Sequence, residues 1–367
     1  MKSTYKKLGQ YIRQVDVRNT EGKEDNLLGV SVQKVFIPSI ANTVGTDFTK
    51  YKVVKRGQFT YIPDTSRRGD KIGIALLEDY DEGLVSNVYT VFEIIDEKQL
   101  IPQYLMLWFN RPEFDRYARF KSHGSVREVM DWDEMCNVEL PVPSYEEQLE
   151  IVSAYKAISE RIILKRQIND NLEATAHAIY KNLFVENVDM SDLPEDWFVS
   201  ALGDVAELSA GGDRPLVYSD FPTEGCSVPI FSNGIDEEGL YGFTDKAKIF
   251  EESVTVSARG TVGYVFLREE PYVPIVRLIS VIPNTKYVTA KYLYYALSLI
   301  DLQSTGTSQQ QITVPDFKKR QVLVPSSSAI ADFMVKIEPL FATIKQNKTE
   351  IKTLSVLRDS FLTVLSR

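Results

Sequence analysis

Leu140-Pro141-Val142-Pro143-Ser144-Tyr145-Glu146-Glu147-Gln148 contains the main structural boundary of the chain, because an apolar run ends within it and a long helical pattern begins. Ser144 stands at an N-cap position, and Glu147 follows three residues later, as in a capping box. A related boundary, Val322-Leu323-Val324-Pro325-Ser326, occurs near the end of the sequence. The two boundaries predict two long helices, each preceded by a globular module.

The two boundaries belong to an internal repeat. Pro143 and Pro325 are 182 positions apart, and a polar glycine turn repeats at the same offset. Leu8-Gly9 is echoed by Leu202-Gly203 at an offset of 194, so the first module is 12 residues longer inside than the second. We therefore expect one architectural plan that is used twice.

Apolar residues at alternating spacings of three and four follow both boundaries and form a heptad seam. The residues predicted to pair the helices are Tyr155, Ile158, Ile162, Leu172, Ile179 and Leu183 in the first and Ile337, Leu340, Ile344, Ile351, Leu354, Phe361 and Leu365 in the second. Lys165, Asn169, Asn347 and Arg358 interrupt the seam, and such residues cost stability but fix register. Two equal seams favour pairing of the helices with each other, although two amphipathic helices on a globular core are an alternative. A helix over 146–184 would span about 58 Å.

The segments before the helices have the pattern of mixed α/β modules. Short β-rich runs separated by Gly-rich turns are predicted as strands at 228–231, 254–257, 264–267 and 276–281. An aromatic, Leu-rich helix follows in each copy, at 102–109 and 290–297, and its composition favours a place in the core. The predicted fold class is α+β, with modules at 1–143 and 191–325 and helical spacers at 144–190 and 326–367.

Composition and charge narrow the possible function classes. The chain has 367 residues, 44% hydrophobic and 25% charged, which is typical of a soluble globular protein, and it has no apolar run long enough for a membrane span. Cys136 and Cys226 are its two cysteines, and no CxxC occurs, so a reducing cytoplasm is the expected location and no structural zinc site is expected. The net charge is −9, and residues 144–198 hold 5 Lys/Arg against 11 Asp/Glu. A DNA-binding role would therefore need a basic partner to neutralise most of the phosphates.

The sequence offers few groups for catalysis. It has no Gly-x-x-x-x-Gly-Lys-Ser/Thr loop, no Gly-x-Ser-x-Gly elbow and no His-Glu-x-x-His. We expect His177 to be solvated or packed, and His123 to contact DNA or to have a structural role. Asp96-Glu97-Lys98 is predicted to be a solvated turn. No catalytic residue and no metal ligand is assigned.

Polar, Gly-containing loops at matched places in the two modules are the remaining conspicuous feature. Arg and Lys suit guanine and Asn and Gln suit adenine, whereas Ser, Thr and Gly amides suit phosphates. The predicted DNA-binding residues are Arg67, Arg68, Lys71, Lys121, Ser125 and Arg127 in the first module and Asn233, Arg259, Thr261, Thr307, Ser308, Gln309 and Gln310 in the second.

At these positions the sequence resembles the specificity (S) subunits of type I restriction-modification enzymes. The residues that carry the resemblance are 84–89, 202–205, 256–263, 292–297, Gly306-Thr307 and above all 140–148, which is similar to the family's Pro-x-x-Glu-Gln start of a conserved helix. The likeness covers nearly the whole chain. Residues 326–330 lack the Glu-Gln pair, which leaves open whether both helix starts contact a partner in the same way.

The resemblance implies a function and a set of partners. Each module would be a target recognition domain that reads one half of a bipartite, asymmetric site in double-stranded DNA. The two helices would pair as an antiparallel coiled coil, set the spacing of the half-sites and dock two methyltransferase (M) subunits. S-adenosylmethionine, ATP and Mg²⁺ would be bound by the methyltransferase and restriction/translocase (R) subunits, and this chain would bind none of them and would be non-catalytic.

Two other interpretations remain open on the sequence. One is a coiled-coil scaffold whose globular ends bind proteins and not DNA, and co-purification with a methyltransferase would separate it from a DNA reader. The other is an enzyme whose site the sequence does not reveal. A deep polar pocket with convergent titratable groups would favour that interpretation.

Overall fold

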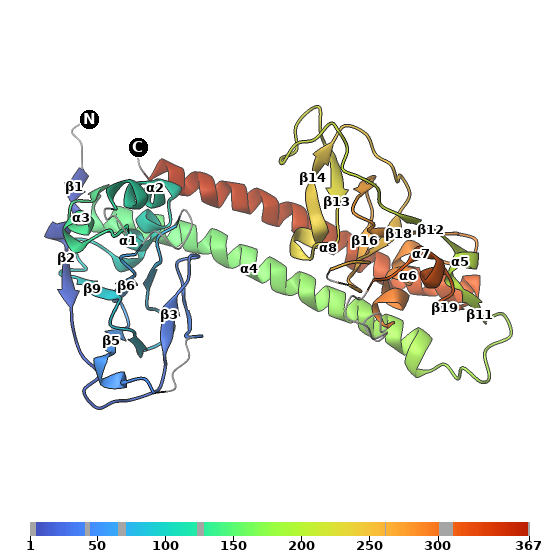
Figure 1. Cartoon of the computed structure of the whole chain (residues 1–367), viewed down its shortest axis with the longest axis horizontal. Coiled ribbons are helices and arrows are strands. Elements are labelled where there is room, and N and C mark those ends of the chain that lie inside the picture. Colours follow the sequence, from blue (N-terminus) through green and yellow to red (C-terminus); the bar gives the residue numbers. More distant parts are fainter. Residues whose placement is uncertain are drawn as a thin grey trace. The chain divides into compact units, whose positions relative to one another are not determined.

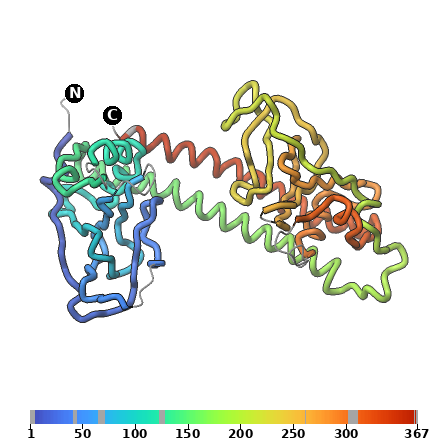
Figure 2. Tube along the Cα trace, viewed as in Figure 1, coloured from blue at the N-terminus to red at the C-terminus, as the bar shows by residue number. Residues whose placement is uncertain are grey.

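The computed structural model describes residues 5–40, 45–64, 71–122, 128–260, 262–300 and 311–365. The chain forms two compact units, residues 1–166 with 347–367 and residues 167–346. Each unit combines one mixed α/β module with parts of both long helices, α4 (Tyr145–Lys181) and α8 (Ser327–Val364) (Figures 1 and 2). The division between the units therefore falls within the long helices and not at their ends.

The first module consists of small antiparallel sheets with short helices against them. Its largest sheet has the strand order β2-β9-β6-β7, and the pairs β1-β10, β3-β4 and β5-β8 complete the module. The strands are β1 (Tyr5–Lys7), β2 (Ile12–Val15), β3 (Leu28–Val30), β4 (Phe36–Pro38), β5 (Lys52–Lys55), β6 (Phe59–Tyr61), β7 (Ile74–Leu76), β8 (Glu82–Val85), β9 (Thr90–Ile94) and β10 (Glu139–Pro141). The helices are α1 (Pro102–Phe109), α2 (Pro112–Lys121) and α3 (Trp132–Cys136), with short turns η1 (Leu8–Gln10) and η2 (Phe48–Lys50).

The second module has a four-stranded sheet, β12-β18-β15-β16, a three-stranded sheet, β14-β13-β17, and the pair β11-β19. Its strands are β11 (Phe198–Ala201), β12 (Ala206–Ala210), β13 (Val228–Phe231), β14 (Leu240–Thr244), β15 (Ser253–Val256), β16 (Val265–Arg268), β17 (Val273–Pro274), β18 (Ile279–Pro283) and β19 (Gln321–Val324). Its helical segments are α5 (Leu202–Val205), α6 (Ala290–Ser298), α7 (Val314–Lys318), η3 (Asn182–Glu186) and η4 (Asp236–Gly239). Three of the four predicted strands coincide with β13, β15 and β16. The fourth was predicted from residue 276, but β18 begins at Ile279 because Val276 and Arg277 form a turn.

The aromatic helices belong to the core of both modules, as their composition predicted. Tyr104, Leu105 and Phe109 of α1 are buried, and so are Tyr292 and Leu293 of α6. The Asp96-Glu97-Lys98 segment is an exposed turn, as expected. Both helices therefore contribute buried aromatic side chains to the hydrophobic core of their module.

The repeat is most faithful where each module is closed by a two-stranded sheet. The amide of Leu8 donates to the carbonyl of Val138, and that of Leu202 donates to the carbonyl of Arg320, both at 2.8 Å. Val138 and Arg320 are 182 positions apart. A methyl group on Gly9 would lie 2.8 Å from Cβ of Cys136, so this repeated Leu-Gly position leaves no room for a side chain.

The Tyr hydroxyl groups of α1 and α6 tie the same closing strands to the core. Tyr104 donates to the carbonyl of Pro141 at 3.0 Å, and Tyr292 donates to the carbonyl of Leu323 at 2.8 Å. Pro141 and Leu323 again differ by 182 positions. The offset found in the sequence thus describes equivalent contacts in space.

The start of α4 has the capping box that the sequence predicts. Ser144 donates its amide to the Glu147 carboxylate at 2.9 Å, and the amide of Glu147 donates to Oγ of Ser144 at 3.3 Å. Gln148 is fully buried, accepts a bond from the amide of Ile101 at 2.8 Å and donates to the carbonyls of Gln99 and Pro143. Glu147 therefore closes the capping box, and Gln148 fastens α4 to the segment that leads into α1.

The second copy achieves the same attachment with different residues. Ser326 caps α8 by accepting a bond from the amide of Ala329 at 3.3 Å, and Ile330 occupies the position of Gln148 with an exposed fraction of 7%. Helix α6 is capped by its own Thr289, which accepts a bond from the amide of Tyr292, whereas the equivalent Ile101 offers no side-chain cap. The loss of the Glu-Gln pair in the second copy therefore matches a helix that caps itself.

The two long helices pair antiparallel along the predicted seam. The rings of Tyr155 and Phe361 lie 6.3 Å apart, and Nζ of Lys165 donates to Oδ1 of Asn347 at 2.8 Å. In the other unit, the ring of Phe184 in η3, which directly follows α4, lies 5.4 Å from the ring of Phe333 near the start of α8. All of the predicted seam residues are buried or half-buried, as residues that face a partner helix would be.

Lys165 and Asn347 mark the centre of the helix pair. They are 182 positions apart, so each is the counterpart of the other in the repeat. When two equivalent helices pair antiparallel, only residues at the midpoint can contact their own counterparts. Lys165 also lies 3.0 Å from Glu350, and Arg161 pairs with the same carboxylate. The polar interruption of the seam is thus a satisfied network at the centre of the pair, where it fixes the register.

Candidate DNA-binding interface

Three polar loops of the second module converge on the side chain of Asn233. Its Oδ1 accepts a bond from the amide of Ala258 at 2.8 Å, and its Nδ2 donates to the carbonyl of Val276 at 2.6 Å. Residues 258–260 follow β15, residues 232–234 follow β13, and Val276 lies between β17 and β18. The amide of Asn233 therefore braces these loops, although the sequence suggested it as a direct base contact.

Arg259 lies at the edge of this convergence. It is exposed and forms an antiparallel bridge with Gln311, next to a bond from the amide of Ile312 to the carbonyl of Ala258 at 3.0 Å. The Arg259 loop and the end of the Gly306-to-Gln311 polar run, predicted separately as DNA-binding segments, are therefore neighbours. Thr261, Thr307, Ser308, Gln309 and Gln310 lie outside the described residues.

The turn at Val276 and Arg277 is one of two places in the described part of the module where consecutive non-glycine residues have positive φ, the other being residues 237–238. Val276 and Arg277 have φ angles of 51° and 60°, and both are exposed. The carbonyl of Gly211 accepts a bond from the amide of Arg277 at 3.0 Å, and the carbonyl of Gly212 accepts one from the amide of Val276 at 2.8 Å. The sequence had placed this turn inside a strand and did not identify Arg277 as a functional candidate.

A buried arginine supports the loop that begins at Asn233. The guanidinium of Arg268 stacks 3.6 Å over the ring of Phe231, donates to the carbonyl of Glu238 at 2.6 Å and bonds Thr255 at 3.0 Å. Burial lowers the pKa of Arg268 to about 10, so the group remains charged at neutral pH. Gly239, at φ 83°, sits so close to the carbonyl of Ser232 that a Cβ would be 2.5 Å from it. Arg268 and Gly239 therefore brace this loop through contacts with its backbone.

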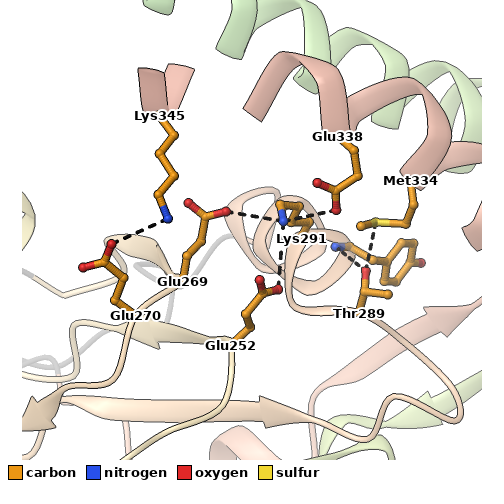
Figure 3. Close-up of polar contacts among 9 residues, drawn as sticks. Glu252, Glu269, Glu270, Thr289, Lys291, Met334, Glu338 and Lys345 are labelled. Atoms are coloured by element: carbon orange, nitrogen blue, oxygen red, sulfur yellow. Dashed lines mark hydrogen bonds and ion pairs between the residues drawn. The ribbon is translucent and has the colours of Figure 1, made fainter. Parts of the chain in front are cut away.

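A second buried cation attaches the sheet of this module to α8 (Figure 3). Lys291 of α6 is 4% exposed, and its Nζ lies 3.4 Å from Glu269, 3.2 Å from Glu338 and 3.9 Å from Glu252. Burial alone would lower the pKa of Lys291, but the three carboxylates outweigh it and raise the pKa above its ordinary value. Glu252 directly precedes β15, and Glu269 directly follows β16. The Lys291 cluster therefore attaches these two strands, of which β15 leads into the Arg259 loop, to α8.

In the first module the structure places two of the predicted DNA-binding residues. Lys71 is exposed, and the next amide, Ile72, donates to Oδ1 of Asp115 at 3.1 Å. Lys121 lies 3.6 Å from Glu134, so part of its charge is neutralised within the module. Arg67, Arg68, Ser125 and Arg127 lie outside the described residues, and so does His123.

Asp115 also holds a lysine that the sequence gave no reason to select. Lys34 is 6% exposed, its Nζ lies 2.9 Å from Oδ1 of Asp115, and it donates to the carbonyl of Phe109. Burial lowers the pKa of Lys34 in spite of this partner. The pair connects the β3–β4 turn to α1, α2 and the segment that carries Lys71.

The described residues show no arrangement typical of an active site. No group of three or more His, Cys, Asp or Glu residues among them could hold a metal ion, and no helix in the same segments combines the length and apolarity of a membrane span. A cavity of about 350 Å³ in the second unit is lined by Asp170, Glu173, His177, Tyr294 and Ser298, among others. Tyr294 donates to Glu173, Ser298 donates to the carbonyl of Tyr294, and burial lowers the pKa of His177. These groups bond to one another or pack, and none of them is a nucleophile beside a base.

Comparison with known proteins identifies the family of the chain. The family model "Type I restriction modification DNA specificity domain" matches residues 9–174 and again residues 194–353. A putative type I specificity subunit of Mycoplasma pneumoniae is 33% identical over 142 residues, which are 38% of this chain and 42% of that protein. The MjaIX type I restriction enzyme specificity subunit of Methanocaldococcus jannaschii is 24% identical over 300 residues, 73% of this chain and 69% of that protein.

The match with a solved structure extends along almost the whole fold. The S subunit of a type I restriction-modification system from M. genitalium covers 99% of this chain and 96% of its own, with a TM-score of 0.63 and 14% identity. The chain spans about two fifths of the length of the Mycoplasma pneumoniae relatives that it matches. The family model nevertheless matches it twice and over most of its length, so the chain belongs to the type I restriction modification DNA specificity family.

Proposed function

We propose that this chain is the DNA-specificity subunit of a type I restriction-modification complex, in which each module reads one half of a bipartite, asymmetric site. The observation that carries the proposal is the convergence of the loops bearing Asn233, Arg259 and Val276 on one edge of the second module. Exposed arginines on braced loops suit base edges and phosphates. The modules differ in their loops, which favours two different half-sites over a palindrome.

The proposal assigns the chemistry to partner subunits. Two methyltransferase subunits would bind the paired helices and supply S-adenosylmethionine, and a restriction/translocase subunit would supply ATP- and Mg²⁺-dependent cleavage. The chain itself would recognise DNA without catalysing a reaction. A cytoplasmic location is part of this proposal, and the free Cys136 and Cys226 are compatible with it.

The test of the function is the methylation pattern of the genome. Methylated positions would be sequenced in cells with the intact gene, in cells without it and in cells complemented with it. A two-part motif that disappears with the gene and returns on complementation is the expected result. An unchanged methylation pattern, together with failure to co-purify a methyltransferase, would instead favour a protein-binding scaffold.

A separate experiment tests the role of the helices in spacing. Removing residues 156–162 of α4 together with residues 350–356 of α8 takes seven residues from each helix and keeps the heptad phase. Seven residues correspond to about 10 Å of helix, or about 3 base pairs. The expected result is the same two half-sites with a shorter gap. If the gap stays constant while the complex remains active, the helices do not set the spacing.

A further inference from the structure

The turn formed by Val276 and Arg277 has a backbone that its residues disfavour. Both φ angles are positive, and the amide of Leu278 donates to the carbonyl of Ile275 at 3.0 Å, which closes a turn of the type I′ kind. That turn is dominated by Asn, Asp and Gly, because a β-branched or long side chain is strained at positive φ. The sequence nevertheless places a valine and an arginine there, and 52% of the valine is exposed.

The surroundings hold the turn in this conformation from three directions. The amides of Val276 and Arg277 donate to Gly212 and Gly211, and Asn233 donates to the carbonyl of Val276. Gly211 approaches so closely that a Cβ on it would lie 2.7 Å from the backbone nitrogen of Ile275. Backbone strain persists where neighbouring structure over-determines it, and such positions cluster at ligand-contact sites.

Among the described residues, neither of the two strained side chains belongs to a hydrophobic core cluster of the module. Both are exposed, so neither contributes to the core, and a turn needed only for chain reversal would be more stable with Asn-Gly. The side-chain amide of Asn233 bonds the backbone of both Val276 and Ala258. The exposed Arg277 and Arg259 directly follow these two residues, so one asparagine holds the backbone beside both arginines. The two guanidinium groups therefore project from loops whose backbones are fixed relative to each other.

We propose that Val276 and Arg277 are specificity-determining residues of the second module, which contact base edges in its half-site. An arginine on a rigid turn can place two donors on O6 and N7 of guanine, and the adjacent apolar group suits the thymine methyl. A phosphate contact would carry no sequence information, so the sequence preference of the variants separates it from a base contact. The proposal rests on the function proposed above and names the residues that perform it in one half-site.

The test measures methylation by the assembled complex of this chain with its methyltransferase partner. A pool of DNA duplexes, randomised at each position of the site, would be methylated and sequenced. The variants are Arg277→Ala, the double substitution Val276→Asn with Arg277→Gly, and Lys286→Ala as a control. Lys286 is exposed and lies beyond the opposite end of β18, so the control removes the same charge at the other end of that strand.

Arg277→Ala should relax the preference at one or two adjacent positions of a single half-site by about 5- to 150-fold. The double substitution should relax the same positions and raise the Tm of the chain by about 2 to 4 °C, because Asn-Gly relieves the turn. Lys286→Ala should leave every position unchanged. If Arg277→Ala behaves like the control, or weakens all sequences equally, the inference is wrong.

The outcomes separate the inference from the function on which it rests. A wild-type complex that methylates a two-part site, combined with an unaltered profile for both turn variants, overturns only the assignment of Val276 and Arg277. A wild-type complex with no sequence preference overturns the proposed function and this inference together. Because the double substitution is expected to stabilise the fold, a loss of selectivity in that variant has no explanation in misfolding.

Discussion

Replacing Gln148 with alanine tests whether the Glu-Gln start of α4 is a structural anchor. The carboxamide of Gln148 is fully buried and makes three hydrogen bonds, to the amide of Ile101 and to the carbonyls of Gln99 and Pro143. Alanine removes all three bonds at once. The amide of Ile101, which is 7% exposed, then has neither its partner nor free access to water.

The expected cost follows from those contacts. A buried donor left without a partner costs about 1–3 kcal/mol, whereas the carbonyls of Gln99 and Pro143 can turn to water because their residues are not buried. Loss of the one buried methylene group, Cγ, adds about 0.8 kcal/mol. Gln148→Ala should therefore lower the free energy of unfolding of the first unit by about 2–4 kcal/mol. Gln103→Ala is the matched control, because its amide bonds Glu78 at the surface and should contribute about 0.5 kcal/mol or less.

Two measurements check this prediction. Urea unfolding followed by tryptophan fluorescence reports mainly on the first unit, since Trp108 and Trp132 lie in it. Hydrogen exchange of the peptide containing Ile101 reports on the single amide that loses its partner. If Gln148→Ala and Gln103→Ala have equal unfolding midpoints, or if the Ile101 amide keeps its protection, the anchoring role is refuted.

Three further predictions concern the other polar contacts. Asn233→Asp replaces the donor to the Val276 carbonyl with a carboxylate, so it should relax selectivity in the same half-site as Arg277→Ala in the methylation assay while leaving partner binding intact. Hydrogen bonds from Lys165, and then from Arg161, hold the pKa of Glu350 below its usual range. The stabilisation is therefore complete above about pH 4.5 and is lost as the pH falls through the lower pKa of the folded state. Glu350→Gln should make the free energy of unfolding depend less on pH in this acidic range. Lys291→Met removes the buried cation from three carboxylates that are 30–53% exposed and stay hydrated, so it should destabilise the second unit by about 1–2 kcal/mol in urea unfolding.

The helices and their seam were predictable from the sequence because the signal is long and local. Period, capping box and polar interruptions all lie within one stretch of chain, and the equal offset of 182 made each copy a check on the other. The pairing of Lys165 with Asn347 was implicit in that offset, since they are counterparts in the repeat. What the seam could not reveal is Glu350, which joins the pair from outside the seam.

The Val276–Arg277 turn was not predictable by the same reasoning. Residues 273–281 form an apolar, β-rich run with no Gly or Asn to signal a turn. The left-handed backbone is imposed by Gly211, Gly212 and Asn233, which are distant in sequence. Tertiary contacts thus override the local preference, and the place where the local pattern fails is also the place for which we propose a function. Lys291 was missed for a similar reason, because its three carboxylates come from separate segments.

The contacts that the two copies share are those that close each module and attach it to the long helices. The Leu-Gly turns, the tyrosine bonds to the closing strands and the seam all repeat at equivalent positions, although Gln148 is exchanged for Ile330 where α6 caps itself with Thr289. The strained turn and its asparagine brace lie outside that shared framework. In the described part of the chain none of these shared contacts involves the braced loops of the second module, so changes in those loops leave its closing strands in place. Under the function proposed above, substitutions in a few braced loops would change one half-site and leave the contacts shared by the two copies in place.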